Sequence, residues 1–396
     1  MRQSWRWFGP EDNVTLSEIR QAGAAGIVTA LYQIPPGEVW PREEIRARRE
    51  VIEAAGLTWD VVESLPVSEA IRTGAPESAK LIANWAASLE NLAAEGLSVI
   101  CYNFMPVLDW IRTNLAAPMP SGATALRFDL IDFAAFDMFV LDREGAVADY
   151  PNNIVAAARS RADSFTSEDR DRLTRNILSG LPGTVERWTP QTLRERLGVY
   201  AEVDAERLRA NLVTFLGKVV PTAERLDMRL CCHPDDPPWP LLGLPRIMST
   251  EADFASLVNA VPSPANGITF CTGSLGARPD NDLPGMMERL GRHVHFLHLR
   301  NVRLEDGTVP GSFHEDEHLG GSTDMIAVIK AVLEEQARRR AEGRNDWQIP
   351  MRPDHGQNIL DDRHRASAPG YPAIGRLKGL AELRGAMMAL DHGSAA

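Results

Sequence analysis

Eight short apolar runs, most of them followed by a helical pattern, constrain the fold more than any other feature of the chain. The runs occupy residues 5–8, 26–31, 58–65, 97–105, 228–233, 267–271, 294–300 and 348–354. Helical periodicity recurs between them, at residues 16–22, 42–55, 78–94, 205–225 and 323–342. A strand, a crossover helix and a second parallel strand form a βαβ unit, and eight such units close a TIM barrel. The sequence therefore predicts an α/β fold, a (β/α)8 barrel that spans residues 1–396 as one domain.

The alternation of strands and helices is interrupted once, between residues 108 and 204. This stretch shows no parallel strand, and its patterns predict helices at residues 128–141, 163–181 and 190–200. We expect a helical insertion between strands four and five that caps one mouth of the barrel. A separate helical domain is the alternative interpretation.

Charge and composition exclude several classes of function. With 42 basic and 54 acidic residues the formal net charge is −12, which argues against a nucleic-acid surface. No apolar run approaches the roughly 18 residues that a membrane-spanning helix needs. The N-terminal residues MRQSWRWFGPED contain no apolar core of a secretory signal, and four cysteines are too few for a disulfide framework. These features favour a cytoplasmic protein that acts on a small molecule and leave both a monomer and a homo-oligomer open.

Polar residues with metal-binding side chains end the last four apolar runs. They are His233, Cys271, His298 and Asp354. In a TIM barrel the carboxyl ends of the strands meet on one face, so these side chains should approach one another. Imidazole, thiolate and carboxylate together suit a transition-type divalent metal. Each residue taken alone has a simpler interpretation, because single histidines and cysteines in strands usually serve packing and hydrogen bonding.

The two cysteines before His233 are expected to point in opposite directions. Side chains alternate along a strand, so if His233 points into the barrel, Arg229 and Cys231 do so too. Cys232 then faces the surrounding helices and serves packing. Cys271 is the better candidate ligand, since it stands at the end of its run.

The string HEDEH, at residues 314–318, fits the H-E-x-x-H pattern of zinc proteases. That motif requires a continuous helix that places both histidines on one face. Pro310 and Gly311 precede the string, and Gly320 and Gly321 follow it, so no long helix fits between them. We expect a mobile loop over the barrel mouth instead of a protease motif.

With these residues identified, the chain closely resembles the mannonate dehydratase family over almost its whole length. The strings that carry the resemblance are WRWFGP (5–10), IRQAG (19–23), GIVTAL (26–31), CYNFMPVLDW (101–110), ALRFD (125–129), FAAF (133–136), LTRNI (173–177), HPDDPPWPLLGLPRIMST (233–250), ANGITFCTGSLGARPDNDL (265–283), MRPDHGQ (351–357) and GYPAIGRLKGLAELRG (370–385). The resemblance implies a xylose-isomerase-like TIM barrel that uses Mn²⁺ or Fe²⁺. It also implies dehydration of D-mannonate to 2-dehydro-3-deoxy-D-gluconate, on the glucuronate branch of hexuronate breakdown.

The family's functional residues transfer to matching positions of this chain. The resemblance implies that the metal ligands are His233, Cys271, His298 and Asp354, the set that the strand ends indicate. It implies proton transfer by His355 and Tyr371 and leaves open which of them takes the C2 proton. One departure concerns ALYQIP, where Tyr32 and Gln33 stand in place of two histidines common in the family. This change leaves the preferred substrate open.

Binding of an anionic sugar acid requires cationic contacts near the strand ends. We expect Arg300 or Arg352 to clamp the carboxylate or a hydroxyl group, and Asn103 to contact a sugar hydroxyl. Ion pairing with Asp235, Asp236 or Asp354 is the alternative role of the two arginines.

Three other functions are weighed against the dehydratase. A related aldonate dehydratase would use the same site with another substrate. A metal-dependent sugar isomerase would typically place several carboxylates around two metals, whereas this set contains Cys271 and fits one. An inactive binding protein would have no need of the intact ligand set together with His355 and Tyr371.

Overall fold

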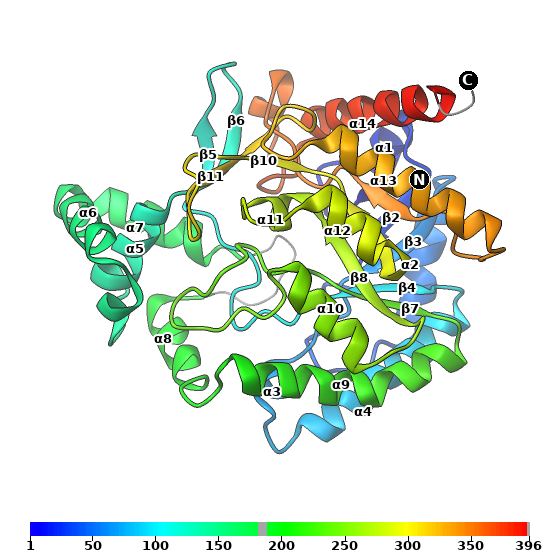
Figure 1. Ribbon diagram of the computed structural model, residues 1–396, viewed down its shortest axis with the longest axis horizontal. Helices are drawn as coiled ribbons and strands as arrows, with labels where there is room; N and C mark the ends of the chain where they lie inside the picture. The colour runs from blue at the N-terminus through cyan, green and yellow to red at the C-terminus, as the bar shows by residue number, and fades with distance from the viewer. Residues whose placement is uncertain (181–187, 394–396) are drawn as a thin grey trace.

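A closed barrel of eight parallel strands forms the centre of the computed structural model, which describes residues 1–180 and 188–393 (Figure 1). The strands follow the order β1-β12-β9-β8-β7-β4-β3-β2 around the barrel. Their bounds are β1 Arg2–Arg6, β2 Gly26–Thr29, β3 Thr58–Glu63, β4 Val99–Tyr102, β7 Arg229–Cys232, β8 Asn266–Cys271, β9 Val294–His298 and β12 Pro350–Arg352. Each of the eight predicted runs overlaps one of these strands, so the predicted TIM barrel is confirmed.

Helices surround the barrel and bury its outer face. They are α1 Leu16–Gln21, α2 Arg42–Ala54, α3 Glu69–Thr73, α4 Ser78–Ala94, α9 Ala205–Arg225, α10 Glu251–Ala260, α11 Thr272–Gly276, α12 Leu283–Leu290, α13 Met325–Ala341 and α14 Ala373–Gly393, with short η3 Gly291–His293 and η4 Leu360–His364. Side-chain hydrogen bonds cap the N-termini of several helices. Thr15 and Thr250 form capping boxes at the starts of α1 and α10, and Asp204 caps α9. None of the helices in the described residues is both long enough and apolar enough to cross a membrane.

The inside of the barrel is filled by apolar side chains below the strand ends. Five of them form a buried cluster: Val28, Val61, Cys101, Cys231 and Phe296. Cys232 belongs instead to the main core outside the barrel, so the predicted alternation of the two cysteines is confirmed. This packed interior closes the barrel and leaves one face at the carboxyl ends of the strands for a site.

The segment between β4 and β7 combines a hairpin with a helical lobe. It contains β5 Asn114–Pro118, β6 Thr124–Phe128, α5 Leu130–Ala135, the π-helical η1 Phe136–Val140, η2 Ala146–Asp149, α6 Asn152–Ser164, α7 Ser167–Leu178 and α8 Pro190–Gly198. Helices α5 to α7 form a lobe at one side of the molecule (Figure 1), with a small core rich in alanine. The predicted helices at 128–141 and 190–200 correspond to α5 with η1 and to α8. The one at 163–181 corresponds to α7, and its last residue, Leu181, lies outside the described residues.

A second sheet departs from the sequence-based expectation. Strands β5 and β6 join β10 Asn301–Leu304 and β11 Phe313–Asp316 in an antiparallel sheet of order β10-β11-β6-β5. The segment 108–204 is therefore not purely helical, because the hairpin β5–β6 lies in it. Residues 314–316 of the HEDEH string belong to β11, and no residue of the string is helical, as the flanking glycines and proline predict. The expectation of a mobile loop was therefore wrong for these three residues, which pair with β10 and β6.

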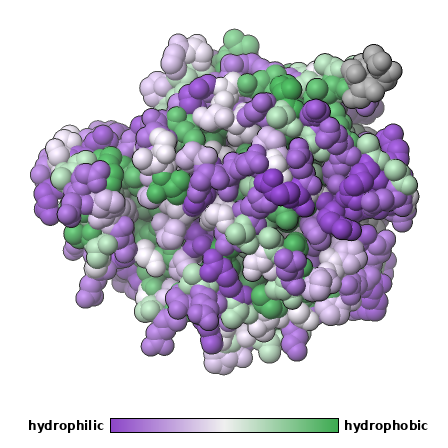
Figure 2. Space-filling view, in the orientation of Figure 1, coloured by the Kyte–Doolittle hydropathy of each residue, from purple (hydrophilic) through white to green (hydrophobic). Residues whose placement is uncertain are grey.

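Hydrophilic residues cover much of the surface. Figure 2 shows one face, on which apolar residues are interspersed among hydrophilic ones. This distribution agrees with the ordinary charged content of the chain, 24% of all residues.

Candidate metal and acid–base site

The four predicted metal ligands lie together at the carboxyl ends of neighbouring barrel strands. His233 follows β7, Cys271 ends β8, His298 ends β9, and Asp354 comes two residues after β12. In the sheet register Cys271 is paired with His298. The ligand atoms of His233, Cys271 and His298 all lie within 4.8 Å of one another. Strand order alone thus brings together residues that are far apart in the sequence.

Asp354 completes the cluster through one carboxylate oxygen. Its Oδ2 lies 3.8 Å from Cys271 Sγ and 3.9 Å from His298 Nδ1. His233 Nε2 and His298 Nδ1 are 3.1 Å apart. Two imidazoles, a thiol and a carboxylate in such proximity match the donor chemistry that first-row divalent metals take in proteins.

The surroundings of Cys271 favour its thiolate form. Burial raises the pKa of this thiol, but the Arg300 guanidinium and His298 outweigh burial and lower the pKa below its usual value. Ser274 donates hydrogen bonds to Sγ from its backbone nitrogen, at 3.4 Å, and from its hydroxyl, at 3.2 Å. Because a metal binds the thiolate, this environment prepares Cys271 to act as a ligand.

Asp354 is held in an unusual backbone conformation. Its φ of 63° lies in the left-handed region, which residues other than glycine seldom adopt. Arg300 Nε lies 2.9 Å from Asp354 Oδ2, and Arg352 pairs with Oδ1. One residue earlier, the ring of His318 hydrogen-bonds to the Pro353 carbonyl at 2.7 Å. These contacts stabilise the turn that aims Asp354 at the other three ligands.

His355 stands between a carboxylate and a phenol. Its Nδ1 lies 3.0 Å from Glu315 Oε1, and its Nε2 lies 3.2 Å from Tyr371 Oη. Arg300 Nη1 is also 2.7 Å from Nδ1. The Glu315 carboxylate can only accept, and Arg300 Nη1 already donates to its Oε1, so we assign the Nδ1 proton toward Glu315 and leave Nε2 to face the Tyr371 hydroxyl. Burial lowers the pKa of His355 and raises the pKa of Tyr371 to about 12, although Arg6 and Arg352 oppose the latter shift.

A network of buried charged residues lies next to the His355–Tyr371 pair and contacts it through Glu315 and Arg300. Arg112 donates to Asp236 Oδ1 at 2.7 Å and to Glu315 Oε1 at 3.0 Å, and Arg300 pairs with both carboxylates. Burial raises the pKa of Glu315, but Arg300, His355 and Arg112 outweigh it and hold the pKa at about 2. The network joins the segment after β4, the loop after β7 and strand β11 around the site.

Two residues of this site, Glu63 and Glu315, are not among the residues that the sequence predicted. Glu63 ends β3 and lies 3.5 Å from His298 Nε2, while Arg352 binds it through Nε and Nη2 at 2.9 and 2.7 Å. The strand-end rule that indicated the candidate metal ligands applies equally to Glu63 and could have indicated it. Glu315 was not predicted as a site residue, because it lies in the HEDEH string, for which the sequence predicted a loop.

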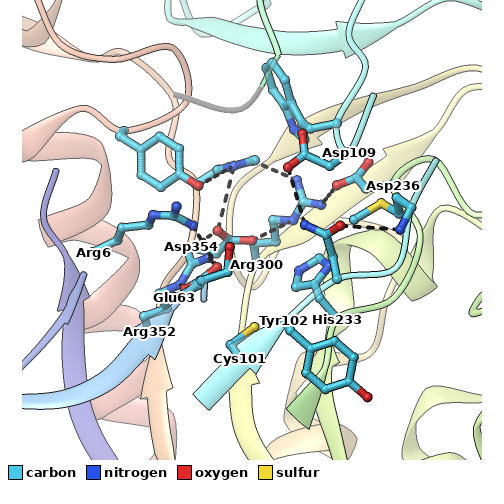
Figure 3. Close-up of a pocket in the computed structure, with 16 residues that line it drawn as sticks. Arg6, Glu63, Cys101, Tyr102, Asp109, His233, Asp236, Arg300, Arg352 and Asp354 are labelled. Carbon is cyan, nitrogen blue, oxygen red and sulfur yellow. Dashed lines mark hydrogen bonds and ion pairs between the residues drawn. The ribbon is translucent and has the colours of Figure 1, made fainter. Parts of the chain in front are cut away.

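The predicted substrate contacts line the same pocket (Figure 3). Arg300, Arg352 and Asn103 face it together with His233, Asp354, His355 and Tyr371. Both arginines form ion pairs with Asp354, the alternative that the sequence left open. The Oδ1 atom of Asn103 accepts a hydrogen bond from Arg72 at 2.9 Å. Tyr32 lines an adjoining pocket, whereas Gln33 is exposed.

Comparison with known proteins agrees with this site. The family model described as "D-mannonate dehydratase (UxuA)" matches residues 1–396. Mannonate dehydratase 1 of Agrobacterium fabrum is 56% identical over 393 residues, 99% of this chain and 98% of that protein. The mannonate dehydratase of Rhizobium meliloti is 55% identical over 392 residues, again 99% and 98% of the two chains. The crystal structure of mannonate dehydratase from Streptococcus suis serotype 2 has a TM-score of 0.77 at 34% identity and covers 100% of this chain and 95% of its own. The chain therefore belongs to the D-mannonate dehydratase family.

Proposed function

We propose that this protein is a metal-dependent hydro-lyase that dehydrates D-mannonate to 2-dehydro-3-deoxy-D-gluconate in hexuronate breakdown. The observation that carries the proposal is the convergence of two imidazoles, a thiol and a carboxylate beside the His355–Tyr371 pair. Membership in the family supplies the substrate. The free and buried state of all four cysteines agrees with a reducing, cytoplasmic location.

His233, Cys271, His298 and Asp354 would hold one divalent cation, Mn²⁺ or Fe²⁺. The mixture of nitrogen, sulfur and oxygen donors suits these ions better than Mg²⁺ or Ca²⁺, which prefer oxygen ligands alone. A bound cation of this kind supplies Lewis acidity beside the substrate's oxygens.

The acid–base chemistry falls to His355 and Tyr371. Dehydration removes a proton from C2, next to the carboxylate, and hydroxide from C3. The neutral imidazole of His355 is suited to accept the C2 proton at Nε2, while Glu315 stabilises the imidazolium that results. Tyr371, whose pKa is raised to about 12, stays protonated at neutral pH and donates to the departing hydroxyl. The enol product then tautomerises to the keto acid.

The segment 108–204 acts in this proposal as a cap that belongs to the barrel domain. Asp109 and Trp110 line the pocket, and the Trp110 ring lies edge-on to His355 at 6.1 Å. Arg112 bridges Asp236 and Glu315. The first residues of the cap thus form part of the pocket wall, and Arg196 of α8 lines the adjoining pocket.

Removal and replacement of metal tests the proposed reaction. Protein stripped with a chelator should form no 2-dehydro-3-deoxy-D-gluconate from D-mannonate, and added Mn²⁺ or Fe²⁺ under reducing conditions should restore formation. Epimeric aldonates serve as the comparison, because they present the same charge with altered hydroxyl geometry. Equal turnover of stripped and reloaded protein would refute the metal requirement, and turnover of an epimer alone would refute the substrate.

Replacing Glu315 by glutamine should lower kcat by about 10- to 100-fold with little change in KM. The amide keeps the shape of the side chain but removes the charge that stabilises protonated His355. Loss of one partner from the buried network should also lower the melting temperature. Steady-state kinetics and thermal unfolding measure the two effects.

The matched control is Glu317→Gln. Glu317 lies two residues away and is exposed, where it pairs with Lys378. This variant should retain wild-type kcat. Wild-type kcat in Glu315→Gln would exclude a role of the carboxylate at His355.

A further inference from the structure

We propose that Arg6 binds the carboxylate group of the sugar-acid substrate through the edge formed by its Nε and Nη2 atoms. The inference rests on the proposed function and adds the residue that recognises the substrate's negative charge. Arg6 is the last residue of β1 and only 2% exposed. Its guanidinium reaches from one wall of the pocket toward Glu63 and Asp354 (Figure 3).

Among the residues that the structure describes, hydrogen bonds reach only one side of the Arg6 guanidinium. Nη1 donates to Glu63 Oε1 at 2.7 Å. Nε is buried and has no hydrogen-bond partner, and Nη2 takes part in no hydrogen bond among the described residues. A buried charged donor without an acceptor is unfavourable, so this edge calls for an acceptor from outside the chain.

Other arginines of this protein indicate which chemical group fits the Nε–Nη2 edge. Eight of them present the same edge, Nε with Nη2, to both oxygens of one carboxylate. The pairs are Arg46–Glu95, Arg127–Glu305, Arg143–Asp137, Arg278–Asp280, Arg289–Glu251, Arg338–Glu335, Arg344–Asp346 and Arg352–Glu63. Two parallel N–H donors match the spacing of carboxylate oxygens, which makes a carboxylate the fitting occupant.

The other two arginines of the pocket are already occupied. Arg352 uses its Nε–Nη2 edge on Glu63 and pairs with Asp354 through Nη1. Arg300 pairs with Asp236, Glu315 and Asp354. Binding the substrate with either residue would break an existing ion pair, whereas Arg6 has a free edge.

Two aromatic rings lie within cation–π distance of the Arg6 guanidinium. Its central carbon lies 5.1 Å from the centre of the Phe8 ring and 5.9 Å from that of Tyr371. Such stacking limits the motion of the side chain before substrate arrives, which reduces the entropy lost on binding. A carboxylate on this edge would lie near Tyr371, so that C2 and C3 of the same molecule come within reach of the His355–Tyr371 pair.

Two variants test the role of Arg6. Arg6→Gln removes both the positive charge and the paired N–H donors of the Nε–Nη2 edge. Arg6→Lys keeps a positive charge for Glu63 but lacks the paired donors. For each variant we would measure the metal content and the kcat and KM for D-mannonate. Calorimetry would give the Kd of D-mannonate and the Kd of D-mannonamide, in which an amide replaces the carboxylate. Arg6→Gln should raise the KM and Kd of D-mannonate by about 30-fold or more, and Arg6→Lys by about tenfold. The Kd of D-mannonamide should change less than about threefold, with metal content unchanged.

Arg2→Gln is the matched control. Arg2 lies at the other end of β1 and pairs with Asp60 of β3 at 2.5 Å, just as Arg6 pairs with Glu63 of the same strand. This variant should keep the wild-type KM, because its ion pair lies at the opposite end of the barrel. In Arg6→Gln, Glu63 still binds Arg352, which preserves the fold around it.

The outcomes separate this inference from the proposed function. An unchanged KM and Kd for D-mannonate in both Arg6 variants, or an equal loss for the acid and its amide, would overturn the role of Arg6. Absence of turnover by metal-loaded wild-type protein would instead refute the proposed reaction. The Kd comparison would then still decide whether Arg6 recognises the carboxylate of an aldonate. If Arg6→Gln does not fold, the Kd values of D-mannonate and D-mannonamide are compared for Arg6→Lys instead, and that comparison decides whether Arg6 binds the carboxylate.

Discussion

Replacing Cys271 by serine is expected to abolish metal binding and activity together. A serine hydroxyl stays protonated at neutral pH and is a poor ligand, whereas the pKa of the Cys271 thiol is already lowered by Arg300 and His298 against the effect of burial. Loss of an outer-shell partner alone costs 10- to 100-fold in metal affinity, so loss of a ligand should cost more than about 100-fold. Metal analysis after gel filtration and the initial rate with D-mannonate measure both effects.

Cys232→Ser provides the matched control for this experiment. Cys232 is also buried, but it belongs to the core outside the barrel. A hydroxyl placed there should lower the free energy of unfolding by about 1–3 kcal/mol and leave the metal content unchanged. Full metal content and full activity in Cys271→Ser would show that the thiol is not a ligand.

The barrel was predictable because its signals are local. Each strand is a short apolar run, and each run ends where the periodicity changes, as at residues 228–233 and 294–300. The four candidate metal ligands followed from one further rule, that the carboxyl ends of barrel strands share a face. Strand order brings these four side chains to the same face, which explains why residues far apart in the sequence could be grouped.

The antiparallel sheet was not predictable from local patterns. Strand β6 pairs with β11, and three barrel strands lie between them in the sequence. Strand β5, with the sequence NLAAP, is short and contains small residues and a proline, so nothing in it indicates a strand. These strands exist because they pair with one another, and such pairing leaves little trace in either sequence alone.

Two of the buried charges around His355, Arg112 and Glu315, were missed for a related reason, whereas Asp236 was named as a possible ion-pair partner of the arginines. Arg112 and Glu315 come from distant segments, and each resembles an ordinary surface residue in its own stretch. Burying them is tolerable only because each finds its partners in the folded chain. A sequence without alignment contains no sign of that mutual compensation.

Tyr371→Phe and His355→Gln are each expected to lower kcat by about 10²- to 10⁴-fold. The first change removes only the hydroxyl that lies 3.2 Å from His355 Nε2. The ring still packs edge-on against Phe8 at 4.9 Å, and Arg376 still donates to the Tyr371 carbonyl at 3.0 Å, so fold and metal content should persist. Because the two residues act on one proton path, the double variant should lose little more than either single variant.

The pH dependence of kcat/KM distinguishes the roles of the two residues. His355 must be neutral to accept a proton, and burial lowers its pKa below the ordinary value of histidine, so activity should be full near neutral pH and fall only at more acidic pH, as His355 becomes protonated. His355→Gln should abolish this acid limb, whereas Tyr371→Phe should retain it. Tyr150→Phe is the control, since it removes a hydroxyl that donates to Asp137 at 2.9 Å in the helical lobe and should leave kcat unchanged. Retention of wild-type kcat in Tyr371→Phe would exclude the phenol as the acid, and an unaltered acid limb in His355→Gln would exclude the imidazole as the base.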